Sequence, residues 1–231
     1  MSDEIISQGE VTPAPIPAAA GQLLSVKQGM WSAGTGDTSG FDGIVRSTWM
    51  PAGSQPPFGD WYDAAVARVA ELVESPYDRV VFDRGELTLY VRAEKLVEVA
   101  QVLRDDAQLR FEYCISVSGV HYPNEAGAQL HSVIHLQSIT HNRRLRVETS
   151  ASEENPHIPS VVSVYPAADW HEREAWDMFG IVYDGHPHLT RILMPDDWVG
   201  HPQRKDYPLG GIAVEFKGAK VPPVEERRRY Q

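Results

Sequence analysis

The stretch HEREAWDMFG, residues 171–180, groups charged and aromatic side chains that could do chemistry. Glu174 and Asp177 are three positions apart, so a helix makes them neighbours, and two close carboxylates can share a proton and act as acid and base. Arg173 flanks Asp177, and its positive charge opposes such sharing. A catalytic pair, a solvated charged face and a charged docking surface all stay open. Docking is favoured, because the chain after Gly180 continues without a second helix.

The local pattern predicts a short helix over residues 170–179. Asp169 suits the N-cap, with Glu172 as its capping-box partner, and Gly180 lies where helices commonly end. Glu172 and Glu174 point to different sides at helical spacing and do not form a carboxylate pair. The opposite arc, which we expect to face the core, holds Ala175, Trp176 and Phe179.

Other residue types that could do chemistry form no recognisable site. His131 and His135 share a strand face, and His186 and His188 flank a proline, but neither pair has a nearby cysteine and HExxH is absent. The single cysteine, Cys114, is expected on the polar side of its strand as a buried, inert thiol. One thiol cannot hold an iron–sulfur cluster, and no phosphate-binding glycine loop occurs. We therefore expect no metal or cofactor in this chain.

Composition narrows the classes of partner. The 231 residues carry a net charge of −11, which disfavours nucleic acid, because phosphate binding needs a clustered basic surface. No apolar run is long enough to cross a bilayer, and the acidic start MSDEIISQGE is unlike a secretory signal.

The helices and strands predicted around the charged stretch indicate a two-layer α+β domain over residues 59–193. Clustered strands with helices on one face give a mixed, mostly antiparallel sheet of about five strands. Arg84-Gly85 and His141-Asn142 suit tight turns, Asp60 suits a helix N-cap, and residues 160–166 read as a short extended piece. We expect helices over 60–75 and 93–106, and strands over 79–83, 86–91, 111–122, 131–140 and 143–150.

Two further segments flank this domain. Residues 1–58 are rich in proline and glycine and predict an irregular extension, which is either a disordered leader or, given Trp31, Phe41 and Trp49, a strap on a partner. Residues 194–231 predict an extended C-terminal arm. The arm carries 7 Lys and Arg against 6 Asp and Glu, so it is +1 and the remaining chain is −12, a contrast that favours docking of the arm on another surface.

Residues 131–209 resemble, almost continuously, the C-type (30-kilodalton-type) subunit family of proton-pumping NADH:quinone oxidoreductase, respiratory complex I. Agreement is weaker back to about residue 59. One departure is His121-Tyr122, where the family often has Asp-Tyr. The positions that match the family signature are Glu172-Arg173-Glu174, Asp177, Met178-Phe179, His186 and Arg191-Ile192-Leu193.

The resemblance implies an α+β protein in the peripheral arm of the complex, on the cytoplasmic side of the cell membrane in bacteria. It implies no cofactor in this chain, with FMN and Fe-S clusters held by partner subunits, so the isolated chain is not expected to be catalytic. It also implies docking on the large D-type subunit and the Fe-S B-type subunit. The residues expected at that interface are Arg173, Glu174, Asp177, His186, Arg191, Arg204, Lys205, Asp206 and Tyr207.

Two alternatives accompany this expectation. Related subunits occur in membrane-bound hydrogenases and in ferredoxin-linked quinone reductases, so the same scaffold could serve another redox machine. The chain could also be a free-standing interaction module.

Overall fold

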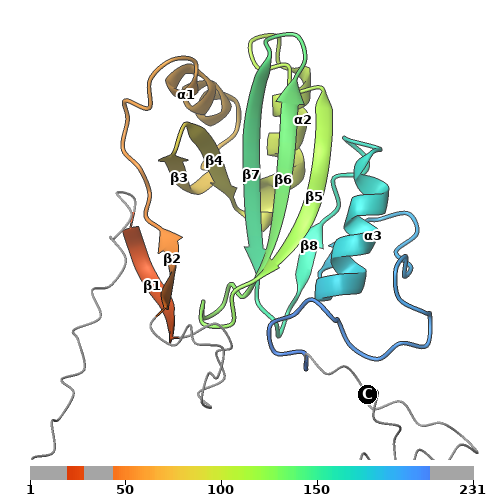
Figure 1. The fold of residues 1–231 in the computed structure, drawn as a ribbon. Helices are drawn as coiled ribbons and strands as arrows, with labels where there is room; N and C mark the ends of the chain where they lie inside the picture. The colour runs from red at the N-terminus through yellow and green to blue at the C-terminus, as the bar shows by residue number, and fades with distance from the viewer. Residues whose placement is uncertain (1–19, 29–43, 209–231) are drawn as a thin grey trace, which may run out of the picture.

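The computed structural model describes residues 20–28 and 44–208, and a five-stranded mixed sheet forms its centre (Figure 1). The strand order is β3-β4-β7-β6-β5, with β4 and β7 parallel and every other neighbouring pair antiparallel. This sheet confirms the predicted α+β class. The strands are β3 (Tyr77–Asp83), β4 (Glu86–Val91), β5 (Tyr113–His121), β6 (Leu130–Ser138) and β7 (Arg143–Ala151).

Helices α1 (Tyr62–Leu72) and α2 (Leu96–Asp105) cover one face of the sheet (Figure 1). A 3-10 turn, η1 (Ala93–Lys95), leads into α2. Val69 of α1 and Val99 and Leu103 of α2 are fully buried against alternate residues of the strands, such as Leu89 of β4. The alternation in the strands thus places one apolar face under the helices, as two-layer packing requires.

The start of α1 differs from the prediction for Asp60. Trp61 occupies the N-cap position, and Asp60 has a φ of +49°. The carboxylate of Asp63, in the first turn, instead accepts hydrogen bonds from the backbone N–H groups of Phe58 and Gly59, at 3.0 and 2.8 Å. A carboxylate in the first turn of the helix therefore binds the preceding loop, which the spacing alone did not indicate.

Both predicted tight turns are present. Arg84 and Gly85 have φ values of +51° and +80° between the antiparallel strands β3 and β4, as a type I′ hairpin turn requires. Asn142 also has a positive φ, +51°, at the end of the β6–β7 connection.

Cys114 lies on the core face of β5, not on the polar side that simple alternation predicted. The register of β5 against β6 shifts between Cys114 and Ser116, which is a β-bulge. The bulge lets Cys114 and Val117 both be buried. Burial raises the pKa of the Cys114 thiol to about 12, so the thiol is un-ionised at neutral pH.

Part of the segment predicted to be irregular forms a small sheet. Strands β1 (Ala20–Gln28) and β2 (Val45–Pro51) pair antiparallel, separate from the main sheet. The amide of Asn124 donates a 2.8 Å hydrogen bond to the carbonyl of Leu24 and ties this hairpin to the main domain. The expectation of a wholly irregular segment was therefore wrong for these two stretches, where register shifts between Ala20 and Gln22 and between Leu23 and Ser25 interrupt the alternation. Trp31 and Phe41 lie outside the described residues.

The predicted extended piece at 160–166 is a series of turns. The strand lies just before it, because β8 (His157–Pro159) pairs parallel with β9 (Val182–Asp184). Helix α3 (Ala168–Phe179) connects the turns to β9 and packs beside edge strand β5 (Figure 1). In the described part of the chain, no helix has both the length and the apolar character needed to cross a membrane.

Candidate interface around helix α3

Two glycines allow close packing around helix α3, one against β5 and one at the end of the helix. A Cβ on Gly119 would lie 2.4 Å from the ring of Phe179, so the helix approaches the strand at a place where no side chain intervenes. Gly180 ends α3 in the left-handed conformation, with φ +77°, and a Cβ there would lie 2.6 Å from the ring of His201. The predicted stop at Gly180 is confirmed, and glycine is required there for both conformation and space.

Glu172 is buried and binds the turns before α3. Its carboxyl group accepts hydrogen bonds from Ser160 Oγ at 2.6 Å and from the backbone N–H of Val161 at 2.8 Å. The predicted capping box was wrong, because Ala167 is the N-cap and Glu172 reaches eleven and twelve residues back. Burial raises the pKa of Glu172 to about 7, although both hydrogen bonds act in the opposite direction.

Asp177 is also buried and organises the segment that follows β9. One carboxylate oxygen accepts the backbone N–H groups of Ile192, Leu193 and Met194 at 3.1, 2.8 and 2.9 Å. Burial alone would raise the pKa of Asp177, but these N–H groups and a bond from Arg191 outweigh it, so the pKa lies below its usual value.

Arg191 and Arg173 complete this cluster. Arg191 Nη1 lies 2.5 Å from Asp177 Oδ1, and its Nη2 donates to the carbonyls of Trp198 and Gly200 at 2.8 and 3.3 Å. Arg173 donates to the carbonyls of Thr190 and Arg191, at 3.2 and 3.1 Å. Both guanidinium groups therefore bind the backbone of residues 190–200, which folds back on the helix.

The segment of residues 198–207, here called the strap, covers the C-terminal end of α3. His201 Nδ1 lies 3.0 Å from the carbonyl oxygen of Asp177, the N–H of Gln203 donates to Met178 at 3.1 Å, and Arg204 Nε donates to Phe179 at 2.6 Å. A helix leaves its last carbonyls without partners, and a cation is favourable there. The strap supplies hydrogen-bond partners for these carbonyls, and Arg204 supplies the cation.

The strap also binds the end of β5 through His121. The backbone N–H of Lys205 donates to His121 Nδ1 at 2.9 Å, and His121 Nε2 lies 2.5 Å from Glu153 Oε1. Since a backbone N–H only donates, Nδ1 accepts, and the ring proton on Nε2 bonds to Glu153. The structure thereby gives His121, the departure from the family pattern, a positioning role.

Five of the nine predicted interface residues have side chains that bond within this chain, and Arg173, which binds the carbonyls of Thr190 and Arg191, is one of them. Asp177 and Arg191 bond to each other, and Arg204 binds Phe179. The buried imidazole of His186 lies 3.2 Å from the carbonyl oxygen of Asp169. Their direct bonds are intramolecular, so they hold the surface in shape. Asp177 and Glu174 consequently do not form a carboxylate pair, since one is buried and the other exposed.

Of the other four, Glu174, Lys205 and Asp206 are exposed, whereas Tyr207 is half-buried. Three large apolar side chains are also exposed on α3 and on the segment that packs against it: Trp170 at 67%, Leu193 at 59% and Val199 at 74%. We define Trp170, Glu174, Leu193 and Val199 as the α3 surface. Sequence reasoning did not identify Val199 or His201, whose environments depend on the folding-back of the strap.

The histidines and carboxylates of the described residues do not gather into a metal site. No three His, Cys, Asp or Glu side chains converge as a metal site would require in residues 20–28 and 44–208. His131 and His135, which alternate on one strand face, have separate partners. His131 lies between Glu125 and Glu148, at 2.8 and 2.6 Å, whereas His135 lies 3.3 Å from the hydroxyl of Ser116.

The fold and this site define a class of protein, an α+β chain in which the side chains of the charged motif bond mainly within the chain itself. The chain belongs to the family described as the respiratory-chain NADH dehydrogenase 30 Kd subunit, whose model matches residues 89–213. It is similar to two proteins that are each named as the C-type subunit of NADH-quinone oxidoreductase. The protein of Nocardia farcinica is 57% identical over 96% of this chain and 90% of its own length. That of a Nocardioides species is 56% identical over 96% of this chain and 92% of its own length.

One solved structure supports the fold alone. A chain of the membrane-bound sulfane sulfur reductase, an archaeal respiratory membrane complex, matches with a TM-score of 0.54 and 22% identity. The match covers 65% of this chain and 87% of that chain.

Proposed function

We propose that this chain is a scaffold protein, with no cofactor of its own, in the quinone-reducing part of a proton-translocating NADH:quinone oxidoreductase. In that complex, electrons pass from NADH through FMN and Fe-S clusters of partner subunits to quinone, and the chain holds those partners in place. Family membership supports the complex. The observation that carries the scaffold role is the α3 surface, which is held rigidly from within and exposes large apolar side chains.

The internal bonds give this surface a physical rationale. Burying the charges of Asp177 and Arg191 within one chain leaves each of them paired, so a partner need not satisfy them. Trp170, Leu193 and Val199 then remain for contact, and exposed apolar groups of this size commonly mark interfaces. The proposed partners at this surface are the D-type subunit and the B-type subunit beside it.

The proposed location follows from the complex. The chain lies at the cytoplasmic side of the cell membrane and is held there by its partners. The arm of residues 194–231 is proposed to continue the contact. Residues 194–208 pack on their own domain, and residues 209–231 lie outside the described part of the chain.

The test is the assembly of the complex with a Trp170→Ala chain. We expect less of this variant in the isolated complex, and lower quinone reduction from NADH. Oxidation of NADH by an artificial acceptor at the flavin should persist. Leu72→Ala is the matched control, because Leu72 is 42% exposed at the end of α1, away from α3. Equal assembly and equal quinone activity of Trp170→Ala and Leu72→Ala would contradict the scaffold role of this surface.

The native partners distinguish the alternatives. Co-purification with flavin-bearing, NADH-oxidising subunits is expected. Co-purification with a hydrogenase or a ferredoxin-linked reductase would show that this chain is a subunit of a different redox complex. A stably monomeric native chain would favour the free-standing module.

A further inference from the structure

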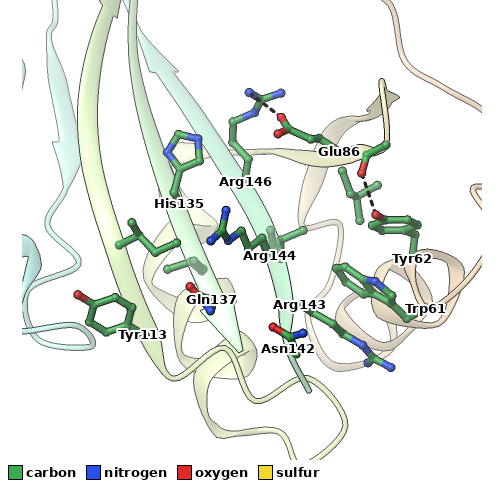
Figure 2. A pocket seen from close by; sticks show the side chains of 15 residues that line it. Trp61, Tyr62, Glu86, Tyr113, His135, Gln137, Asn142, Arg143, Arg144 and Arg146 are labelled. Carbon is green, nitrogen blue, oxygen red and sulfur yellow. Dashed lines mark hydrogen bonds and ion pairs between the residues drawn. The ribbon is translucent and has the colours of Figure 1, made fainter. Parts of the chain in front are cut away.

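A second surface lies on the face of the main sheet turned away from α1 and α2. A groove of about 540 Å³ crosses strands β5, β6 and β7 near the β6–β7 connection and reaches the start of α1 (Figure 2). Strand alternation explains its lining, because Leu145 and Val147 are buried in the core while Arg144 and Arg146 project to the other side. None of its lining residues belongs to the α3 surface.

The groove is basic although the chain is acidic. Arg143, Arg144 and Arg146 line it, and Glu86 is the one acidic side chain among the described residues that do so. Three arginines against one glutamate contrast with the net charge of −11 for the whole chain. This local reversal of charge favours an anionic occupant.

The side chains of the three arginines differ in how many hydrogen bonds and ion pairs they already make. Arg144 is exposed and lies in the middle of the groove (Figure 2), and its guanidinium makes no hydrogen bond or ion pair with any residue that the structure describes. Arg146 donates to Thr88 Oγ1 at 2.8 Å and lies 3.6 Å from the carboxylate of Glu86, which is 70% exposed. Such an exposed pair contributes little, so an incoming carboxylate can displace Glu86.

Aromatic side chains mark both ends of the groove. The guanidinium of Arg143 lies 5.1 Å from the centre of the Trp61 ring, and the hydroxyl of Tyr62 donates to the carbonyl of Gly85 at 2.8 Å. Tyr113, at the opposite end, is 49% exposed (Figure 2). Rigid aromatics beside arginine are typical of protein interfaces, whereas a small free anion would need only one cation.

The spacing of the arginines suggests the form of the occupant. Arg144 and Arg146 are two residues apart on one strand, so their Cα atoms are roughly 6.6 Å apart. Side chains two residues apart in an extended peptide have the same separation, and guanidinium groups bind carboxylates in bidentate fashion. We propose that this groove binds an extended acidic segment of another subunit, with carboxylates at alternate positions facing Arg144 and Arg146.

The proposal goes beyond the scaffold role and rests on it only in that the chain is part of a complex. Charge changes of opposite sign test it in the intact complex. Arg144→Glu is expected to increase the amount of chain released by a salt wash by about tenfold, since a charge pair becomes a repulsion. Glu86→Gln removes the competing carboxylate and is expected to reduce release. Arg92→Glu is the control, because Arg92 is 46% exposed at the far end of β4 and pairs with Asp78.

The same release from Arg144→Glu as from Arg92→Glu would overturn the proposal, as would increased release from Glu86→Gln. Measuring the melting temperature of the purified Arg144→Glu chain distinguishes a folding defect from a loss of binding in the groove. Because Arg144 is exposed, this temperature should not change. Failure of the α3 surface alone would leave these results unaffected, since Trp170→Ala and Arg144→Glu lie on different surfaces.

A photo-cross-linking residue in place of Tyr113 identifies the occupant directly. Within the intact complex, the expected product joins this position to a peptide of another subunit that carries Asp or Glu at alternate positions. A cross-link to residues 1–19 of this chain, to lipid, or to a segment without acidic residues would overturn the proposal, and so would no cross-link at all.

Discussion

The backbone N–H of Lys205 donates a hydrogen bond of 2.9 Å to Nδ1 of His121, across 84 positions of sequence. We predict that His121→Ala loosens the strap, because Lys205 loses its acceptor and Glu153 loses its donor. Trypsin cuts after Arg204 and Lys205, so cleavage there should become roughly fivefold faster, as expected for the loss of about 1 kcal/mol. Cleavage after the exposed Arg84 serves as the internal reference.

His157→Ala is the matched variant for this measurement, because His157 is a half-exposed imidazole paired with Asp184 and lies outside the strap. An unchanged ratio of strap cleavage to Arg84 cleavage in His121→Ala would show that His121 does not hold the strap.

Asp177→Asn should lower the free energy of unfolding by about 2–4 kcal/mol, because Arg191 loses its counter-charge in a buried site. The asparagine would also turn an N–H₂ group toward donors that need an acceptor. Chemical denaturation of the purified chain measures the effect. Asp197→Asn, at an exposed position of the same segment, should change it by less than about 0.5 kcal/mol. Equal losses of unfolding free energy in the two variants would show that Asp177 does not organise this segment.

Glu172 should make stability fall as pH rises from 4.5 to about 7. Its pKa in the folded chain is raised from 4.5 to about 7 by burial, so the folded chain retains a proton that the unfolded chain has already lost. Below this window both states are protonated, and above it both are ionised. The total loss is at most roughly 3 kcal/mol. Denaturation at a series of pH values should give a flatter profile for Glu172→Gln, and identical slopes would contradict the prediction.

His131 should contribute stability that is complete below pH 6.5 and lost as pH rises to about 9. Burial lowers its pKa, but hydrogen bonds with Glu125 and Glu148 more than compensate and raise the pKa to about 9. The folded chain therefore holds the proton longer than the unfolded chain. Titration of the His131 ring by NMR measures this. A His131 titration midpoint below 6.5 would disprove the prediction.

Gly180→Ala should destabilise the chain more than Gly185→Ala does. Both glycines have positive φ, +77° and +83°, but a Cβ at 180 would lie 2.6 Å from His201, whereas nothing lies within 4 Å of one at 185. We expect roughly 1 kcal/mol for Gly185→Ala and more than about 2 kcal/mol for Gly180→Ala. Melting of the purified variants measures this, and equal losses would mean that His201 moves aside freely.

The elements that could be predicted from the sequence are those whose causes are local. The alternation of residues 131–138 and 143–150, the helical spacing in 60–75 and 93–106, and the turns at Arg84-Gly85 and Asn142 depend on neighbours a few positions away. The α+β class and the family followed from these patterns and from the motif around Glu172.

The partners of the charged motif depend on contacts that form only when the chain folds. Spacing on a helix places Glu172 and Asp177 relative to α3, but it does not show that Ser160 and residues 191–194 fold back to meet them. The partners of His121 and Arg204 are likewise set by the strap, and the face of Cys114 is set by a bulge in β5. The sequence does not distinguish a solvated carboxylate from one that is buried and accepts several hydrogen bonds. Their protonation and their role differ because burial and hydrogen bonds act through space.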